Sequence, residues 1–351
     1  MIKHLFILLF LQILGLQIHL YAVQMSSSSD SPAFYFESSG VLQGLSNKEV
    51  QAIYQDREGY IWICTRNGLF RYDGYSLVPY KSNFFNPDLL TNNNIFCVAE
   101  DRKHRLWIGT YRGLNVLDKR TDTLHKFVEA PFSSTVVSQI LVTSDDRVLI
   151  GTDWGLYEYR EAEGDFLGLD SFMTGDGGYS LSVKSLMEDD RGDVWIGTWN
   201  NGLYRYERAT GRYIAYPKMN PRNSAHVVFQ DSRRNIWVGT WGCGLQLLHN
   251  AYEPSRVTWT TFAASSKKEG AISNDLIYSI TEDKNTHSLW VGTQSAISIL
   301  DLKNIDFTPP PPYLQVLLML FLLAILILKC LILWRGKNSL PCCVTGKESC
   351  G

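Results

Sequence analysis

The sequence has little charge of either sign and no excess of basic residues. Charged residues make up 19% of its 351 positions, and the formal net charge is −2. A nucleic-acid-binding protein needs basic side chains to neutralise phosphates, so we expect no nucleic-acid partner. Hydrophobic residues, at 45%, are sufficient for a sizeable core, which excludes wholesale disorder.

The short motifs of catalytic and metal sites are also missing. None of the seven cysteines forms a Cys-x-x-Cys pair, which argues against a zinc site or a thioredoxin-type motif. There is no HExxH, no GxSxG and no phosphate-binding loop, and the histidines are scattered. The Asp pairs at 145–146 and 189–190 are interpreted as solvated turns with too few carboxylates for a calcium site. We therefore predict no catalytic residue, no metal and no cofactor.

The N-terminal residues 1–22 have the pattern of a secretory signal peptide. A short basic start at Lys3 and His4 precedes an apolar run, and Ala22 is followed by a serine-rich stretch. Leu20 occupies a position where cleavage prefers a small residue, so an uncleaved anchor remains the alternative. Either interpretation places the following domain outside the cytoplasm.

A second apolar segment, residues 313–334, follows four consecutive prolines. At about 1.5 Å per residue, a helix of this length spans the hydrocarbon core of a bilayer. Arginine and lysine follow the segment and aspartates precede it, so the positive-inside rule predicts a short cytoplasmic tail at 335–351. The predicted location is the inner membrane, with the preceding domain in the periplasm.

One motif recurs six times between the two ends. Its copies are WICT at 62–65, WIGT at 107–110, LIGT at 149–152, WIGT at 195–198, WVGT at 237–240 and WVGT at 290–293. The first residues of successive copies are 45, 42, 46, 42 and 53 positions apart. A period of 40 to 50 residues is typical of a four-stranded propeller blade.

The flanks of the motif predict the strands of each blade. An alternating apolar stretch precedes each motif, a Gly-Leu step follows in five copies, and a weaker strand with an aromatic residue ends the first five units. We predict an all-β propeller over residues 33–307, six-bladed and closed or an incomplete seven-bladed ring. The sixth copy lacks a fourth strand, and the early strand at 34–36 (FYF) is the simplest candidate to complete it.

Two residues of the motif have predicted structural roles. Each tryptophan is expected to pack between neighbouring blades, and the glycine two positions later is expected to allow close approach of the blades. The five structural tryptophans are Trp62, Trp107, Trp195, Trp237 and Trp290. Cys64 replaces the glycine in the first copy, and Leu149 replaces the tryptophan in the third.

These repeats resemble the two-component regulator propeller. The segments 56–73 (DREGYIWICTRNGLFRYD) and 189–206 carry the resemblance most closely, and it extends over residues 33–307. The resemblance implies the periplasmic sensor region of hybrid two-component systems in Bacteroidetes, which typically detects oligosaccharides and continues into a kinase. No phosphoacceptor-histidine helix or glycine-rich ATP-binding segment follows residue 335, so the chain is interpreted as a truncated, non-enzymatic sensor.

In a four-stranded blade, the turns between the second and third strands share one face with the connections between blades. The residues predicted to bind a ligand there are Arg66, Tyr111, Arg112, Asp153, Trp154, Trp199, Asn200, Asn201 and Trp241. Aromatic rings stack on sugar faces, while Arg, Asn and Asp hydrogen-bond hydroxyl groups. Further turn residues are Asn67, Gln294 and Ser295, and the connections at 92–94 and 176–179 are predicted to lie near the same rim.

The expected partners are an oligosaccharide, the membrane through 313–334, and a second copy or an intact sensor kinase. Two other functions remain open at this point. One is a propeller enzyme of the polysaccharide-lyase or quinoprotein type, which would need a His, Tyr or metal cluster at the axis. The other is a scaffold that binds only proteins.

Overall fold

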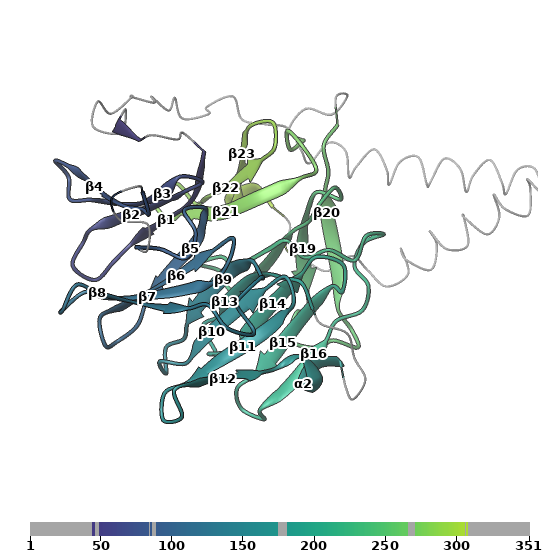
Figure 1. Cartoon of the computed structure of the whole chain (residues 1–351). Coiled ribbons are helices and arrows are strands. Elements are labelled where there is room, and N and C mark those ends of the chain that lie inside the picture. The colour runs from purple at the N-terminus through teal and green to yellow at the C-terminus, as the bar shows by residue number, and fades with distance from the viewer. Residues whose placement is uncertain are drawn as a thin grey trace, which may run out of the picture. The chain divides into compact units, whose positions relative to one another are not determined.

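A computed structural model describes residues 44–45, 49–83, 85, 89–174, 181–265, 271–305 and 307 of the chain. These residues form six antiparallel sheets, each a meander of strands in chain order (Figure 1). The first strands of successive sheets lie side by side, from β1 through β5, β9, β13 and β17 to β21. The sheets are therefore blades arranged about a common axis, as the repeat predicts.

The blades are numbered in chain order. Blade 1 holds β1 (Val50–Gln55), β2 (Ile61–Thr65), β3 (Gly68–Tyr72) and β4 (Leu77–Tyr80), and blade 2 holds β5 (Ile95–Glu100), β6 (Arg105–Thr110), β7 (Leu114–Asp118) and β8 (Thr123–Phe127). Blade 3 holds β9 (Val137–Val142), β10 (Val148–Thr152), β11 (Gly155–Arg160) and β12 (Asp165–Gly168), and blade 4 holds β13 (Val183–Glu188), β14 (Val194–Thr198), β15 (Leu203–Glu207) and β16 (Arg212–Ala215). Blade 5 holds β17 (Val227–Gln230), β18 (Ile236–Gly239), β19 (Leu245–His249) and β20 (Thr258–Phe262), and blade 6 holds β21 (Ile277–Asp283), β22 (Ser288–Thr293) and β23 (Ile297–Asp301). A short helix α2 (Asp170–Thr174) follows blade 3, and a 3₁₀ turn η2 (Leu302–Asn304) follows blade 6.

Blade 6 has three strands within the described residues, as its shorter sequence predicts. The candidate closing strand at 34–36, the signal peptide at 1–22, the connection at 176–179, the apolar segment 313–334 and the tail 335–351 lie outside the described residues and stay predictions. Within the described part of the chain, no helix is long and apolar enough to cross a membrane.

Three of the five predicted structural tryptophans, Trp62, Trp107 and Trp195, pack between blades as predicted, whereas Trp290 is only half-buried. Trp62, Trp107, Trp195 and Trp237 are almost completely buried, and each of the first three belongs to a cluster that includes strands of the next blade. Trp195, for example, packs with Val228, Ile236 and Val238 of blade 5. The tryptophan side chains therefore form much of the apolar contact that holds adjacent blades together.

The interpretation of Asp189 as a solvated turn residue is wrong. Asp189 is buried, and its carboxylate accepts hydrogen bonds from the backbone N–H groups of Arg191 and Asp193 and from the indole N–H of Trp195 at 2.8 Å. The same Asp–Trp bond, with the aspartate six residues before the tryptophan, joins Asp56 to Trp62, Asp101 to Trp107 and Asp231 to Trp237. A buried carboxylate is tolerated here because it accepts several hydrogen bonds.

Blade 3 replaces both members of this pair. Thr143 stands six residues before Leu149, so the blade that lacks the tryptophan also lacks the aspartate. The Thr143 hydroxyl instead donates to Asp145, and its backbone N–H donates to the carbonyl of Arg147 at 2.9 Å. Asp145 itself is exposed, which agrees with the solvated-turn interpretation for this blade.

The motif glycines allow close approach of adjacent blades, as predicted. A Cβ atom on Gly151 would lie 2.6 Å from Val183 Cγ1 of blade 4, and one on Gly197 would lie 2.4 Å from the Ala225 carbonyl at the entry to blade 5. Contacts this short exclude any side chain at these positions. In blade 1 the equivalent Cys64 is fully buried, so this junction accommodates a thiol.

A repeated hydrogen bond links neighbouring blades on the face that carries the turns between first and second strands. In each of five junctions, the backbone N–H of the residue after the turn Asp or Thr donates to a side chain of the next blade. The pairs are Arg57 to Glu100, Arg102 to Asp146, Ser144 to Glu188, Asp190 to Gln230 and Ser232 to Glu282, at 2.7–3.1 Å. Carboxylate and amide acceptors therefore fix the spacing of successive blades on this face.

Candidate functional site

The predicted ligand residues all lie on one face, called here the upper face. It consists of the turns between second and third strands together with the connections that enter each blade. Tyr111 N–H donates to the carbonyl of Asn94 and Trp199 N–H to that of Ser182, so turn and connection are joined within the blade. This agrees with the predicted loop geometry.

A threonine hydroxyl holds each turn in shape. The last residue of the repeated motif donates to the carbonyl oxygen three or four residues later at 2.7–2.9 Å. The six donors are Thr65, Thr110, Thr152, Thr198, Thr240 and Thr293. Side chains at the tips of these turns are therefore carried by rigid loops, which favours a preformed binding surface.

Four rings from blades 4, 5 and 6 meet on the upper face, and we call Trp199, His226, Trp241 and Tyr278 the aromatic cluster. The Trp199 and Trp241 ring centroids are 5.0 Å apart, and His226 lies 4.9 Å from Trp241. Tyr278 meets Trp241 edge-on at 5.4 Å. Trp199 and Tyr278 remain 37% and 49% exposed, so the cluster offers aromatic surface to a ligand.

A charged pair borders the aromatic cluster. Lys184 Nζ lies 2.5 Å from Asp153 Oδ1 and 5.7 Å from the centroid of the Trp199 ring. Ser182 Oγ also donates to Asp153 at 3.3 Å. The pair joins the turn of blade 3 to the first strand of blade 4, and it places one donor group and one acceptor group beside the aromatic surface.

The structure brings together three of the nine predicted residues, namely Asp153, Trp199 and Trp241. Asn200 and Asn201 belong to the same turn as Trp199, and the backbone N–H of Asn201 donates to Thr198. The other four lie on the turns of blades 1 to 3. They are Arg66, which pairs with Glu49 at 2.8 Å, the exposed Tyr111 and Arg112, and Trp154, which is 66% exposed.

Sequence reasoning missed Lys184 and Tyr278, which belong to first strands, and His226, which immediately precedes the first strand of blade 5. Lys184 and Tyr278 are the residues skipped by the ladder where β13 and β21 change register. In blades 1 to 3, the residues left out of the ladder at the same register change are Gln51, Phe96 and Ser138. A bulge re-aims the extra side chain, so each of these blades adds one residue near the upper face. The sequence signal was available, because this position differs in all six copies while the residue before it is Val or Ile in five of them.

The pKa of His226 is lowered to about 4, first by burial and then by the charge of Lys184. The imidazole is therefore neutral at pH 7 and donates or accepts as a neutral group. Among the described residues, no group of three His, Cys, Asp or Glu side chains is arranged to hold a metal ion.

We expect His226 to make the protein less stable in acid. The unfolded chain binds a proton near pH 6.5 and the folded chain only near pH 4, so stability falls as pH falls through this window. The slope due to this one group is at most about 1.4 kcal/mol per pH unit. Urea unfolding between pH 7 and 4.5 should show that His226→Gln loses less stability than the natural sequence. If the stability of the natural sequence and that of His226→Gln fell equally with pH, the lowered pKa of His226 would be contradicted.

The family model of the two component regulator propeller matches residues 44–67, 89–112 and 180–200. The first, second and fourth repeats of this chain are therefore repeats of the two component regulator propeller. One solved relative is the extracellular domain of a protein described as a hybrid two component system of B. thetaiotaomicron. It is 25% identical with a TM-score of 0.53, and the match covers 73% of this chain and 38% of that one. A second such extracellular domain from B. thetaiotaomicron is 24% identical with a TM-score of 0.61, and the match covers 78% of this chain and 36% of that one.

Of two further matches, one covers a short segment and the other has low sequence identity. A curated protein described as Histidine kinase P4 of Formosa agariphila is 36% identical over 59 residues, which are 17% of this chain and 4% of that protein. The virginiamycin B lyase of Staphylococcus aureus is 12% identical with a TM-score of 0.56, over 75% of this chain and 85% of that one, which shows a shared fold alone. The propeller therefore spans well under half of the length of the sensor relatives that it resembles.

Proposed function

We propose that this propeller is the ligand-sensing domain of a hybrid two-component sensor, and that it binds an oligosaccharide in the periplasm. The observation that carries the proposal is the aromatic cluster, partly exposed on rigid turns and bordered by the Lys184–Asp153 pair. Exposed indole rings offer flat apolar surface to the C–H faces of pyranose rings, and the charged pair and neutral imidazole offer hydrogen bonds to hydroxyl groups. The solved extracellular domains support the location.

Signalling is proposed to run from the propeller through residues 313–334 to a kinase, supplied by an intact partner or by a longer form of the protein. In this scheme the propeller itself performs no chemistry. Its contribution is the difference in affinity between two arrangements of the sensor, since a ligand shifts an equilibrium only by that difference.

Replacing Trp199 by alanine is expected to weaken glycan binding by about 30-fold, or about 2 kcal/mol, because it removes a central aromatic contact. The measurement is titration calorimetry on the full chain, with an oligosaccharide selected on an array of neutral and acidic glycans. Trp154→Ala is the matched control, because Trp154 is also an exposed tryptophan on an equivalent turn but lies in blade 3.

Each other outcome of this experiment has a meaning. Equal loss in both variants would move the site toward blade 3, and loss only in Trp154→Ala would contradict the role of the aromatic cluster. Cleavage of a bound glycan would support the enzyme alternative. Capture of periplasmic proteins without affinity for any glycan would support the scaffold.

A further inference from the structure

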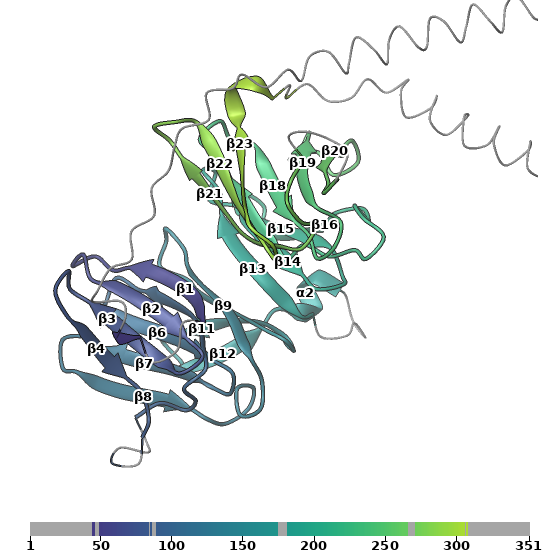
Figure 2. The same ribbon diagram turned by 90° about the horizontal axis from the view of Figure 1, so that it is seen from above.

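Arg222 is an exposed cation on the upper face, in the connection from blade 4 to blade 5. These two blades lie side by side (Figure 2). A Cβ atom placed on Gly242 would lie 3.5 Å from Arg222 Cζ and 3.6 Å from its Nε, so the guanidinium lies against the turn that carries Trp241. The glycine leaves room for it there. A planar cation is therefore placed beside the residue that follows a ring of the aromatic cluster.

The connection that carries this arginine is fastened to the turns of both blades. The Asn220 side chain is buried, and it donates to the Ser224 carbonyl at 2.9 Å and accepts the Ser224 N–H at 3.1 Å. Ser224 Oγ in turn accepts the backbone N–H of Trp241 at 2.9 Å. The Gly202 N–H of the blade 4 turn donates to the Asn223 carbonyl at 2.7 Å. The backbone beneath the cation is thus ordered before a ligand arrives, which lowers the entropic cost of binding.

Within the part of the chain that the structure describes, the Arg222 side chain has no hydrogen bond or ion pair. The neighbouring cation Lys184 differs, since its Nζ lies 2.5 Å from Asp153 Oδ1. Asp275 lies next to the Trp241 turn, but its carboxylate accepts the backbone N–H of Ala264 at 2.7 Å. Arg222 is therefore the cation beside the aromatic cluster that is available to an anionic group of a ligand.

A guanidinium suits one chemical class of ligand in particular. Its planar set of donors matches the two oxygens of a carboxylate or of a sulfate, and such charge-assisted pairs are stronger than hydrogen bonds between neutral groups. A neutral sugar hydroxyl takes a single hydrogen bond and leaves the charge uncompensated. The combination of stacked aromatic rings and an unpaired guanidinium therefore favours a sugar that carries an acidic substituent.

We propose that Arg222 selects acidic oligosaccharides, with a carboxylate or sulfate of the bound sugar on the guanidinium and a sugar ring on the aromatic cluster. This inference rests on the proposed function, because it names the class of glycan that the same site binds. Arg222 acts here as a specificity residue, and the aromatic cluster provides the affinity that acidic and neutral glycans share.

The test begins on an array that pairs oligogalacturonates, alginate oligosaccharides and carrageenan oligosaccharides with the same glycans after carboxyl reduction or desulfation. We expect the tightest binder to be acidic, and its neutral counterpart to bind at least tenfold more weakly in titration calorimetry on the full chain. Arg222→Gln should weaken binding of the acidic glycan by about tenfold and leave the neutral counterpart unchanged. Whether carboxyl reduction or desulfation weakens binding identifies the anionic group.

Arg112→Gln is the matched control, because Arg112 is an exposed arginine on the same face but belongs to the turn between β6 and β7 of blade 2. It should leave both affinities unchanged. Arg222→Lys keeps the charge but loses the planar donors, so we expect it to recover only part of the affinity for the acidic glycan.

Two results would overturn the proposal and leave the proposed function intact, provided that Trp199→Ala still loses affinity. One is equal binding of an acidic glycan and its neutral counterpart by the natural sequence. The other is an equal loss in Arg222→Gln and Arg112→Gln, which would indicate long-range attraction and no contact at Arg222. If no glycan of either kind binds, the proposed function itself is wrong, and the selectivity of Arg222 is wrong with it.

Discussion

Replacing Trp195 by alanine is expected to lower the free energy of unfolding by about 3–5 kcal/mol, the usual cost of removing a large buried aromatic side chain. Trp195 is fully buried and packs with Tyr216, Met219 and Val228 between blades 4 and 5. Its ring also meets Tyr252 edge-on, with centroids 5.9 Å apart. The alanine variant would leave a cavity across a blade junction and a buried Asp189 oxygen without its indole donor. Urea unfolding followed by circular dichroism measures the change.

The matched control is again Trp154→Ala, which removes an exposed indole and should change the stability by at most about 0.5 kcal/mol. Trp195→Phe separates packing from hydrogen bonding, since it keeps an aromatic ring but has no N–H to donate to Asp189. We expect it to fall between the two alanine variants. If Trp195→Ala were no more harmful than Trp154→Ala, the motif tryptophans would not be what holds the blades together.

The sequence was sufficient to predict the fold because each blade repeats the same local pattern. Six copies of the motif predicted the six sheets, the interblade tryptophans and the close approach at Gly151 and Gly197. The Asp–Trp hydrogen bond was missed for a physical reason. An aspartate at a turn is usually solvated, and only the fold of the hairpin brings the Asp189 carboxylate back under the indole of Trp195.

The candidate site was predictable only in part. Strand order alone determines which face carries the turns, so the placement of Asp153, Trp199 and Trp241 on one face followed from the repeat. Their convergence with His226 and Tyr278 depends on the register change of the first strands and on which blades are neighbours. Neither property can be derived from a single repeat, because both arise where two blades meet.

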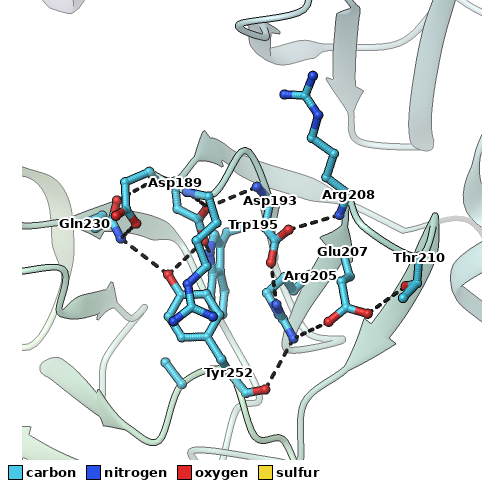
Figure 3. A network of polar contacts seen from close by, with 12 residues as sticks. Asp189, Asp193, Trp195, Arg205, Glu207, Arg208, Thr210, Gln230 and Tyr252 are labelled. Carbon is cyan, nitrogen blue, oxygen red and sulfur yellow. Dashed lines mark hydrogen bonds and ion pairs between the residues drawn. The ribbon is translucent and has the colours of Figure 1, made fainter.

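A buried ion pair beside the turn between the first and second strands of blade 4 gives the second large expected effect (Figure 3). Arg205 of β15 is 2% exposed and its guanidinium contacts the carboxylate of Asp193, which also accepts the backbone N–H of Arg208 at 3.0 Å. Arg205 further donates to the Tyr216 hydroxyl at 3.1 Å and to the Tyr252 carbonyl at 3.4 Å. Glu207 Oε1 lies 3.5 Å from Arg205 Nη2, so Asp193 is the closer of the two carboxylates that pair with this cation.

We expect Asp193→Ala to lower the free energy of unfolding by about 3–5 kcal/mol, because it leaves a buried guanidinium without the closer of its two carboxylate partners. Asp165→Ala is the control, since Asp165 pairs with Arg160 at 2.5 Å on the exposed edge of blade 3, where such a pair contributes at most about 1 kcal/mol. The double variant Asp193→Ala with Arg205→Met removes the uncompensated charge as well and should recover part of the loss. If the double variant were as unstable as the sum of the two single ones, the cost would come from packing, and the charge of Arg205 would not be what makes Asp193 necessary.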